Sequence, residues 1–394
     1  MQIRSSPEVP DQPMPRAALL GVTASVSVFA VAQGLSYPLF TFLMQRQGMS
    51  PSYIGLSAAM TPAGLIASSI FVPALVERFG ARGLAVFSAL AAAILFAAIG
   101  LLQNDFAWFP VRFLIGVAIN PLYILGEVWM IALAPEARRG RIMGIFNAVT
   151  GAGYATGPLT LALVGSHGWP PLLVGVVGFT GCALILYLTT ANLAGFEADE
   201  ERPGGFWSFW RLAPALLVAV TVAAATQQSV YSLLPVFGAA YALPSPTLAA
   251  MISVMSLGNI VLQIPLGLLA ERFGARSMIV VCAAFTMACA LSLPAVITTP
   301  LVWPVLLVIG GVGYGVYTMA LVELGNRFRG SMLVAGNAAF GLMWGVGGII
   351  GPPGSGFAIQ HVGPSGLPAV IAVLSGTLVV FSLYRSLVRW RRDR

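Results

Sequence analysis

The sequence predicts an all-α membrane protein whose twelve transmembrane helices form two pseudo-symmetric six-helix bundles. Three observations lead to this prediction: an apolar composition, a division of the chain into twelve apolar runs, and a second half that repeats the first. Of the 394 residues, 58% are hydrophobic and only 8% are charged, whereas soluble domains carry about 25% charged residues. One aqueous core cannot bury this much apolar surface, so the composition argues against a soluble enzyme.

Polar and turn-forming breaks separate the apolar runs, and each run is long enough to cross a bilayer, which takes about 20 residues. Helices are predicted for all of them because backbone groups in lipid must be hydrogen-bonded within their own segment. The 44 glycines and 27 prolines agree with this, since both residues are common in transmembrane helices. The expected spans are 17–44, 53–76, 84–103, 107–134, 142–164, 171–192, 212–239, 247–270, 278–298, 301–325, 332–358 and 365–388.

The arginines predict the orientation, because cytoplasmic loops of membrane proteins are rich in basic residues. All 20 basic residues are arginine, and the net charge is +7. With a cytoplasmic N-terminus, only Arg46 falls in an outer loop, and Arg112 falls inside a span, while Arg385 at the inner end of the last span is counted with the C-terminal tail. Both termini are therefore expected in the cytoplasm. The basic charge is attributed to membrane orientation and not to nucleic-acid binding.

An internal repeat with a constant shift of 194 positions divides the chain into two halves. The segment Glu77–Arg82 recurs as Glu271–Arg276. The same shift relates Gln33 to Gln227, Tyr37 to Tyr231, Pro110 to Pro304, Tyr123 to Tyr317, Gly157 to Gly351, Pro158 to Pro352 and His167 to His361. We expect a first bundle over 1–192, a solvated cytoplasmic linker over 193–211 and a second bundle over 212–394.

Three segments resemble motifs of the major facilitator superfamily. Gly267–Arg276 is similar to that family's signature loop between the second and third helices of each half. Arg112–Gly116 is similar to its fourth-helix motif, and Gly153–Pro158 to the fifth-helix motif that is typical of exporters. The resemblance implies a monomeric secondary transporter with twelve helices, from an exporter-like branch of bacterial inner-membrane proteins.

Charged residues at the inner ends of the second and eighth spans are the predicted gate. The resemblance implies that these short loops pair with facing helix ends and hold the inward side shut, through ion pairs and helix dipoles. Solvated charges that only set the topology are the alternative. The predicted gating residues are Glu77, Arg78, Arg82, Glu271, Arg272 and Arg276. Glu323 is expected to form an interfacial ion pair near Arg327 and Arg329.

Arg112 and Glu127 are ionisable residues inside the fourth span, and their repeat equivalents are Leu306 and Leu321. An apolar environment favours the neutral form of a carboxyl group, so Glu127 is the predicted proton carrier. Arg112 is predicted to face the cavity and to modulate a nearby carboxyl or bind an anionic group. A structural hydrogen-bonding role is the alternative for Glu127, and snorkelling to the outer interface is the alternative for Arg112. The two lie about 22 Å apart along one helix and cannot touch.

Polar pairs in the first and seventh spans are the predicted substrate contacts. Gln33 and Tyr37 lie four residues apart on one helical face, as do Gln227 and Tyr231. We expect the two pairs to face each other across the pseudo-two-fold axis and to orient a solute without a fixed charge. Interhelical hydrogen bonding is the alternative. Tyr123, Gln228 and Tyr317 are further predicted contacts, and weaker candidates are Asn120, Asn259, Gln263, Tyr314, Asn337 and Trp344.

Gly153, Gly157 and Pro158 are predicted to form a hinge or a tight seam between the halves. Small residues at four-residue spacing allow close helix contact, and proline bends a helix. The sequence has no Gly-Lys-Ser/Thr phosphate loop and no His-Glu-x-x-His pattern, and its three cysteines lie inside apolar runs. We therefore expect no cofactor, no metal and no enzymatic activity.

The expected function is secondary active transport of a small organic solute by alternating access, with Glu127 loading and releasing a proton. Proton antiport and efflux are favoured, the direction resting on the fifth-span motif. The alternative within transport is uptake or exchange of an organic anion with Arg112 as counter-ion. The alternative from another class is a non-transporting membrane receptor. The expected partners are the solute, protons and the lipid bilayer.

Overall fold

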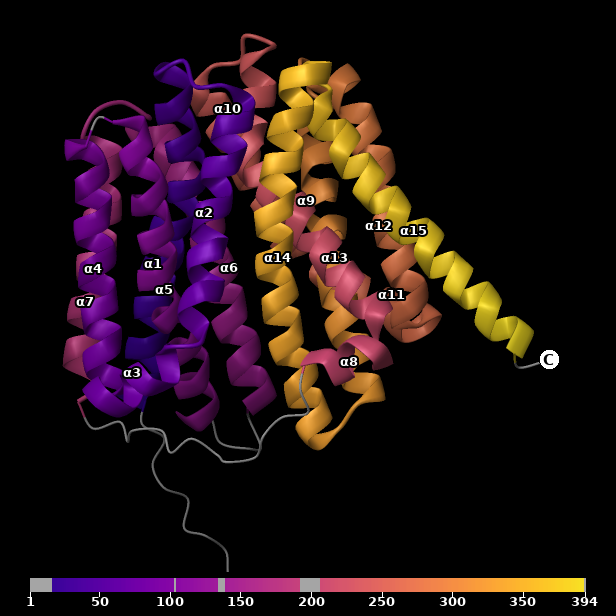
Figure 1. Ribbon diagram of the computed structural model, residues 1–394, viewed down its shortest axis with the longest axis horizontal. Coiled ribbons are helices and arrows are strands. Elements are labelled where there is room, and N and C mark those ends of the chain that lie inside the picture. Colours follow the sequence, from indigo (N-terminus) through magenta and orange to yellow (C-terminus); the bar gives the residue numbers. More distant parts are fainter. Residues whose placement is uncertain (1–15, 103, 134–138, 192–205, 393–394) are drawn as a thin grey trace, which may run out of the picture.

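A computed structural model describes residues 16–102, 104–133, 139–191 and 206–392, and every regular element in these ranges is a helix (Figure 1). The first half contains α1 (Arg16–Arg46), α2 (Pro51–Ser69), α3 (Val72–Phe79), α4 (Ala81–Leu101), α5 (Asp105–Leu133), α6 (Arg139–Val164) and α7 (Pro170–Thr189). The second half contains α8 (Phe206–Leu212), α9 (Pro214–Ala239), α10 (Ser245–Val261), α11 (Gln263–Phe273), α12 (Ala275–Val296), α13 (Val302–Arg327), α14 (Gly330–Val362) and α15 (Gly366–Arg392).

Each of the predicted apolar runs coincides with one long helix or with a bent pair of helices. Among the described residues, eight helices are long and apolar enough to cross a membrane, or ten if each bent pair counts as one span. Helices α6 and α14 occupy the two predicted apolar runs that are not among these ten. The all-helical membrane fold is therefore confirmed, while the exact number of twelve spans stays a prediction.

The second and eighth spans were expected to be continuous, and the structure bends both of them. The break between α2 and α3 turns the chain by 61°, and the break between α10 and α11 turns it by 41°. Proline removes a backbone N–H, and its ring collides with the carbonyl four residues earlier. Pro73 and Pro265 lie four residues after Ser69 and Val261, the last residues of α2 and α10. The two prolines therefore explain where the bends fall.

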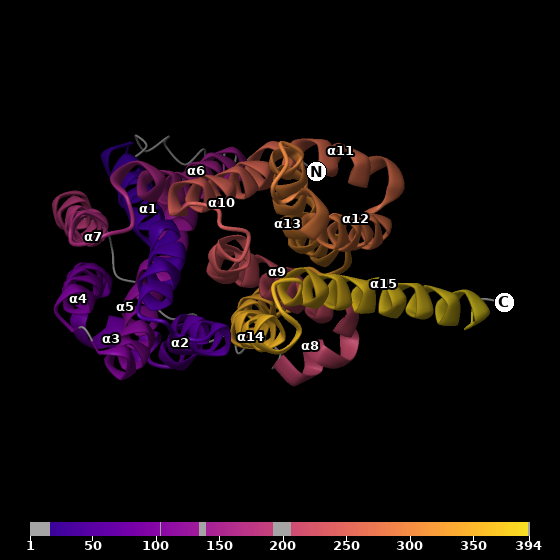
Figure 2. The ribbon, with the colours of Figure 1, turned by 90° about the horizontal axis from the view of Figure 1, so that it is seen from above.

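The two halves lie side by side, with α9 near the middle (Figure 2), and α1 of the first half packs against α9. Helix α2 packs on α14, and α6 packs on α10, so that two helix pairs join the halves. The two pairs are equivalent under the shift of the repeat, which relates α2 to α10 and α6 to α14. We call the side on which α1 begins and α15 ends the terminal side, and the opposite side the far side (Figure 1).

Glycines set how closely the helices cross. A Cβ atom on Gly116 of α5 would overlap the Thr61 carbonyl oxygen of α2, and a Cβ atom on Gly310 of α13 would overlap the Met255 carbonyl oxygen of α10. These two crossings correspond residue for residue under the shift of the repeat. Small residues allow such close approach of transmembrane helices. The pseudo-symmetry therefore extends to individual helix contacts.

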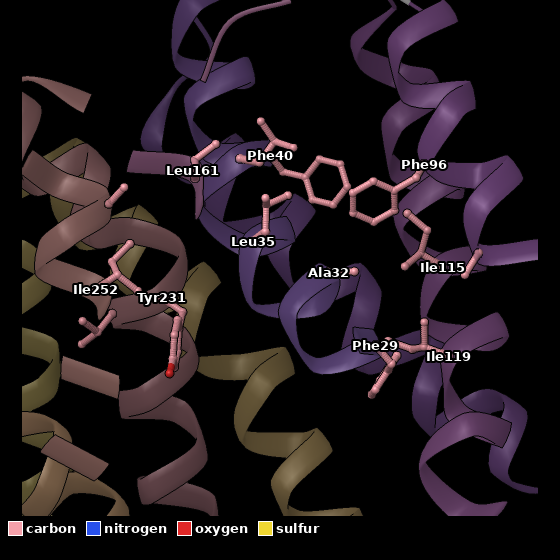
Figure 3. Packing of buried hydrophobic residues seen from close by; sticks show 14 of the residues in the cluster. Phe29, Ala32, Leu35, Phe40, Phe96, Ile115, Ile119, Leu161, Tyr231 and Ile252 are labelled. Atoms are coloured by element: carbon pink, nitrogen blue, oxygen red, sulfur yellow. The ribbon is translucent and has the colours of Figure 1, made fainter. Parts of the chain in front are cut away.

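Aromatic side chains pack among aliphatic ones in the core of the first half (Figure 3). Phe96 of α4 packs against Phe40 of α1 at 5.7 Å and against Phe179 of α7 at 5.4 Å between ring centroids. Phe29 of α1 continues this chain to Phe179 at 6.0 Å. The cluster fixes α1 against the outer helices of its half, and thereby positions the residues that α1 directs toward the second half.

The predicted solvated linker over 193–211 is corrected at its end. Residues 192–205 lie outside the described ranges, but α8 occupies Phe206–Leu212. Phe209 of α8 is fully buried against Phe328 and Phe340. Burial of the Phe209 ring therefore ties the end of the expected linker to the second half.

Candidate functional site

The far side is closed by contacts between α1 and α9. The rings of Tyr37 and Tyr231 lie 6.0 Å apart between centroids. Nearer the far side, the Thr41 hydroxyl donates to the Ser232 carbonyl at 2.6 Å, and the Gln45 amide donates to the Pro235 carbonyl at 3.5 Å. The predicted tyrosines thus do meet on the pseudo-two-fold axis. In this conformation they seal the far side.

Hydrogen bonds between the halves gather on this side of the molecule. The third such bond in the described part of the chain joins the Ser52 amide of α2 to the Gln360 side chain of α14 at 3.3 Å. The Tyr231 hydroxyl lies 2.6 Å from the Ser256 hydroxyl within the second half. The halves therefore hold together at the far side, and no hydrogen bond joins them at the terminal side among the described residues.

Glu127 lies on α5 of the first half, six residues before the terminal-side end of that helix. It is within electrostatic range of Tyr123 on its own helix and of Tyr314 and Tyr317 on α13. Its side chain is exposed, and within the described part of the chain no ion pair or hydrogen bond engages its carboxylate. A carboxylate with these neighbours can take up a proton or attract a cationic group.

Three aromatic rings of the second half lie beside one another in the same region. Tyr317 and Tyr314 are 5.3 Å apart, and Trp344 of α14 lies 4.9 Å from Tyr317 and 5.9 Å from Tyr314. We call Tyr314, Tyr317 and Trp344 the aromatic cluster. Tyr314 and Trp344 were only weak candidates in the sequence, because no pattern there shows that α13 and α14 bring them together.

Arg112 is buried and does not reach the outer interface, so the snorkelling alternative is wrong. Only 1% of its surface is exposed. Its guanidinium lies over the Phe40 ring at 4.8 Å and donates to the Ser57 hydroxyl at 3.4 Å, while Nε has no hydrogen-bond partner. The side chain lies among α1, α2 and α5, within the first half. Phe40 and Ser57 could not be identified as its neighbours from sequence.

The predicted amide contacts divide into two groups. Gln228 donates to the Trp344 carbonyl at 3.5 Å, and Asn120 donates to the Ser68 hydroxyl at 3.0 Å. These side chains join helices of their own half, as the alternative of interhelical hydrogen bonding expects.

Gln33 is buried and Gln227 is half-buried, and the side-chain oxygen of each has no hydrogen-bond partner among the described residues. Tyr123 packs edge-on against Phe29 at 4.8 Å.

The charged loops do not pair across the halves in this conformation. Glu77, Arg78, Glu271 and Arg272 are all exposed at the terminal side. Arg82 donates to the Tyr187 carbonyl at 2.6 Å and lies 4.6 Å above the Tyr187 ring. The first four residues are therefore solvated charges here, and the predicted latch is not formed among the described residues.

Glu323 does form an ion pair, but its partner differs from the expected one. Arg276 at the start of α12 binds the Glu323 carboxylate, which is 7% exposed. Arg327 and Arg329 follow Glu323 closely in sequence, whereas Arg276 is brought to it by the packing of α12 on α13. The pair stays within the second half, so Arg276 is a contact inside one bundle in this conformation.

The predicted glycine seam lies inside the first half and not between the halves. A Cβ atom on Gly153 of α6 would overlap Ala30, and one on Gly157 would overlap the backbone of Leu35. Both contacts are with α1, and Pro158 lies in the interior of α6. Because α6 also packs on α10, the seam fixes the position of a helix that touches the second half.

A separate hollow lies on the surface between α1 and α7. Its volume is about 520 Å³, and it is lined by Val28, Val31, Ala32, Pro170, Leu173, Val174, Val177 and Gly178. All these side chains are apolar, so the hollow offers no group that could orient a polar solute. The described residues also contain no group of three or more side chains placed to hold a metal ion.

Comparisons with known proteins agree with the all-helical membrane fold. The family model described as Major Facilitator Superfamily matches residues 22–324 and 216–393. The chain belongs to this superfamily and is a multi-pass membrane transporter. Relatives include the uncharacterized MFS-type transporter YfkF of Bacillus subtilis, 24% identical over 85% of this chain and 87% of that protein. Another is YcaD of Escherichia coli, also an uncharacterized MFS-type transporter, 23% identical over 84% and 86%.

Solved structures share the fold. The nucleoside transporter NupG superposes with a TM-score of 0.71 at 13% identity, over 95% of this chain and 98% of that one. A bacterial homolog of the human lysosomal transporter Spinster gives 0.72 at 14% identity, over 97% and 98%. These relatives and neighbours are transporters, in keeping with the expectation that the chain is not an enzyme.

Proposed function

We propose that this transporter exports a small organic solute across the bacterial inner membrane in exchange for protons, by alternating access. Glu127 is the proposed proton carrier, because its carboxylate is exposed, unpaired in the described chain, and close to phenols of both halves. This arrangement is the observation that supports the proposal best. A group between two moving halves can face each side of the membrane in turn.

The conformation described here supplies one end of such a cycle. The contact of Tyr37 with Tyr231 closes the far side, while the exposed Glu127 lies toward the terminal side. In the proposed cycle, rocking of the halves breaks the far-side contacts and brings the charged loops of Glu77 and Glu271 against the facing helix ends. One proton that crosses the membrane contributes about 2.3 kcal/mol per 100 mV.

The orientation of the chain in the membrane and its division into two bundles are part of the same proposal. The arginine distribution supports a cytoplasmic terminal side, so the far side faces outward. Two six-helix bundles, over 1–192 and 212–394, are proposed as the moving bodies of a monomer. The fifth-span motif Gly153–Pro158 supports export.

A second candidate is exchange of an organic anion with Arg112 as counter-ion. The supporting observation is that Nε of this buried guanidinium has no hydrogen-bond partner. Arg112 lies behind Phe40 and could meet an anion only after α1 moves away from α9. The Glu127 site is favoured because its carboxylate is already exposed.

Transport in proteoliposomes under an imposed pH gradient tests the proposal. A panel of solutes is screened with the wild-type protein, with Glu127→Gln, and with Asp105→Asn, at the far-side start of the same helix, as a matched control. The expected result is accumulation against the solute gradient by the wild type and the control, and only downhill flux by Glu127→Gln. If Glu127→Gln accumulates the solute as well as the wild type does, Glu127 is not the proton site.

A further inference from the structure

We propose that the hollow between α1 and α7 binds one acyl chain of an anionic phospholipid from the far-side leaflet, and that Arg46 binds the phosphate of that lipid. This inference goes beyond the proposed function and does not depend on the solute or on the direction of transport. Two observations carry it. The first half leaves open an apolar surface that the second half covers, and an unpaired arginine lies at the end of this surface.

The equivalent surface of the second half is covered by the chain itself. Leu173 and Val177 of α7 line the hollow and are 49% and 68% exposed. The shift of the repeat relates them to Leu367 and Ile371 of α15, which are both 0% exposed. Helix α15 packs there on α9, α12 and α14, whereas α7 stands at the edge of the first half (Figure 2). In the first half, a molecule other than this chain must therefore cover the surface.

The hollow has the length of one leaflet. It extends over eight residues of α7, from Pro170 to Gly178, or about 12 Å along the helix. The hydrocarbon layer of one leaflet is about 15 Å thick, half of the bilayer core. A Cβ atom on Gly178 would lie 3.3 Å from the Ala32 side chain, so α7 meets α1 at the deep end. At the other end, the exposed Trp169 lies where tryptophans favour the headgroup level.

Arg46 supplies a positive charge at the far-side end of the hollow. It is the last residue of α1, and its guanidinium donates to the carbonyl and the hydroxyl of Ser166 and to Nδ1 of His167 at 3.2 Å. Ser166 lies four residues before Pro170, so these bonds hold the guanidinium at the loop from which α7 begins. They use three of the five N–H groups of the guanidinium, and two remain for a phosphate.

The charges at this end favour an anionic headgroup over a zwitterionic one. Arg46 is exposed, and in the described part of the chain no carboxylate pairs with it. His167 accepts a hydrogen bond from Arg46 at Nδ1, so this nitrogen carries no proton. A choline headgroup brings its own cation, which Arg46 would repel, whereas a glycerol headgroup brings none. Phosphatidylglycerol therefore matches both the apolar hollow and its charged end.

The lipid would pack on the helix that closes the far side. Val28 and Val31 of α1 form the floor of the hollow. The same helix carries Thr41 and Gln45, which donate hydrogen bonds to α9. A chain in the hollow fills the space between α1 and α7 and thereby supports α1 from the side opposite to α9.

Photochemical cross-linking from the rim of the hollow tests the proposal. The full-length protein carries a benzophenone amino acid in place of Val177, in nanodiscs with equal amounts of phosphatidylglycerol and phosphatidylcholine of the same chain length. Mass spectrometry identifies the lipid in each adduct. We expect phosphatidylglycerol to be enriched about fivefold, which is the effect of one arginine on an anionic lipid. Equal labelling is expected at Val380 of α15, a matched control that is also 68% exposed.

Substitutions separate the headgroup from the acyl chain. Arg46→Gln should bring the labelling at Val177 close to equal, whereas Arg46→Lys, which keeps the charge, should retain the enrichment. Val31→Phe and Val174→Phe fill the hollow and should each lower the enrichment to less than about twofold. Leu184→Phe, on the exposed surface of α7 outside the hollow, should leave it unchanged.

Three outcomes would overturn the proposal, each with a normal elution profile of the protein. Equal labelling by the two phospholipids at Val177 would show that the hollow has no preference for an anionic lipid. An adduct between two copies of the chain would show that a second protomer covers the hollow. Enrichment that persists in Arg46→Gln would show that this arginine does not bind the phosphate.

Discussion

The two halves of this transporter share their backbone contacts and differ in their chemistry. At the crossing of α1 with α6, Gly34 lies against the backbone of Tyr154. At the equivalent crossing of α9 with α14, the large and small residues have changed helices, and Gly348 lies against the Gln228 side chain. One small residue at this crossing is enough for close packing, whichever helix supplies it.

Three ionisable residues within the helices, in contrast, have no ionisable counterparts across the repeat. Arg112 and Glu127 of the first half correspond to Leu306 and Leu321, and Glu323 of the second half corresponds to Trp129. Helix packing therefore does not require these charges. The first half supplies the carboxylate of the proposed site and the second half its aromatic cluster, so neither half has the complete site on its own.

The largest expected effect tests the shared part of this comparison. Gly116→Ala and Gly310→Ala should each lower the free energy of unfolding by about 3 kcal/mol, because the added methyl group meets backbone of a neighbouring helix. Gly83→Ala, where a Cβ atom meets no other atom within 4 Å, should raise it by about 0.5–1 kcal/mol. Thermal unfolding in detergent measures all three. A tolerated Gly310→Ala beside a damaging Gly116→Ala would break the equivalence of the halves.

An intermediate effect is expected where a charged residue of one half corresponds to an apolar residue of the other under the repeat. Arg112→Leu introduces the residue that the second half has at the equivalent position, and it removes a buried, incompletely paired charge. The free energy of unfolding should rise by about 1–3 kcal/mol, with normal expression and loss of coupled transport. A lower unfolding temperature would show that the guanidinium stabilises the first half through Phe40 and Ser57.

The smallest expected effects test Arg82 and Arg276, the last residues of the two repeated loop segments. Glu323→Gln breaks the ion pair with Arg276, whose side chain is 50% exposed, and should lower the free energy of unfolding by about 1 kcal/mol. Tyr187→Leu removes the ring beneath Arg82 and should lower it by about 0.5 kcal/mol. High salt should reduce the first difference more than the second. The reverse order would mean that the two arginines do not act as inferred.

Sequence reasoning was most successful where the repeat or a helical period fixes a position. It predicted the fold, the superfamily and the meeting of Tyr37 with Tyr231. The bends could have been placed from Pro73 and Pro265, since each helix ends four residues before its proline. The partner of Glu323 could not be predicted, because Arg276 is far away in the chain and only tertiary packing brings the two together. The aromatic cluster was missed for the same reason.

Spin-label distances across the far side test the central claim, that contact between α1 and α9 breaks and reforms. Labels at Gln47→Cys and Ala240→Cys, with Cys289 replaced by Ala, report the separation between the far-side ends of α1 and α9 in proteoliposomes. We predict a short and a long population whose proportions change between acidic and neutral pH, and loss of that pH dependence in Glu127→Gln. One unchanged short distance at every pH would contradict alternating access through this contact.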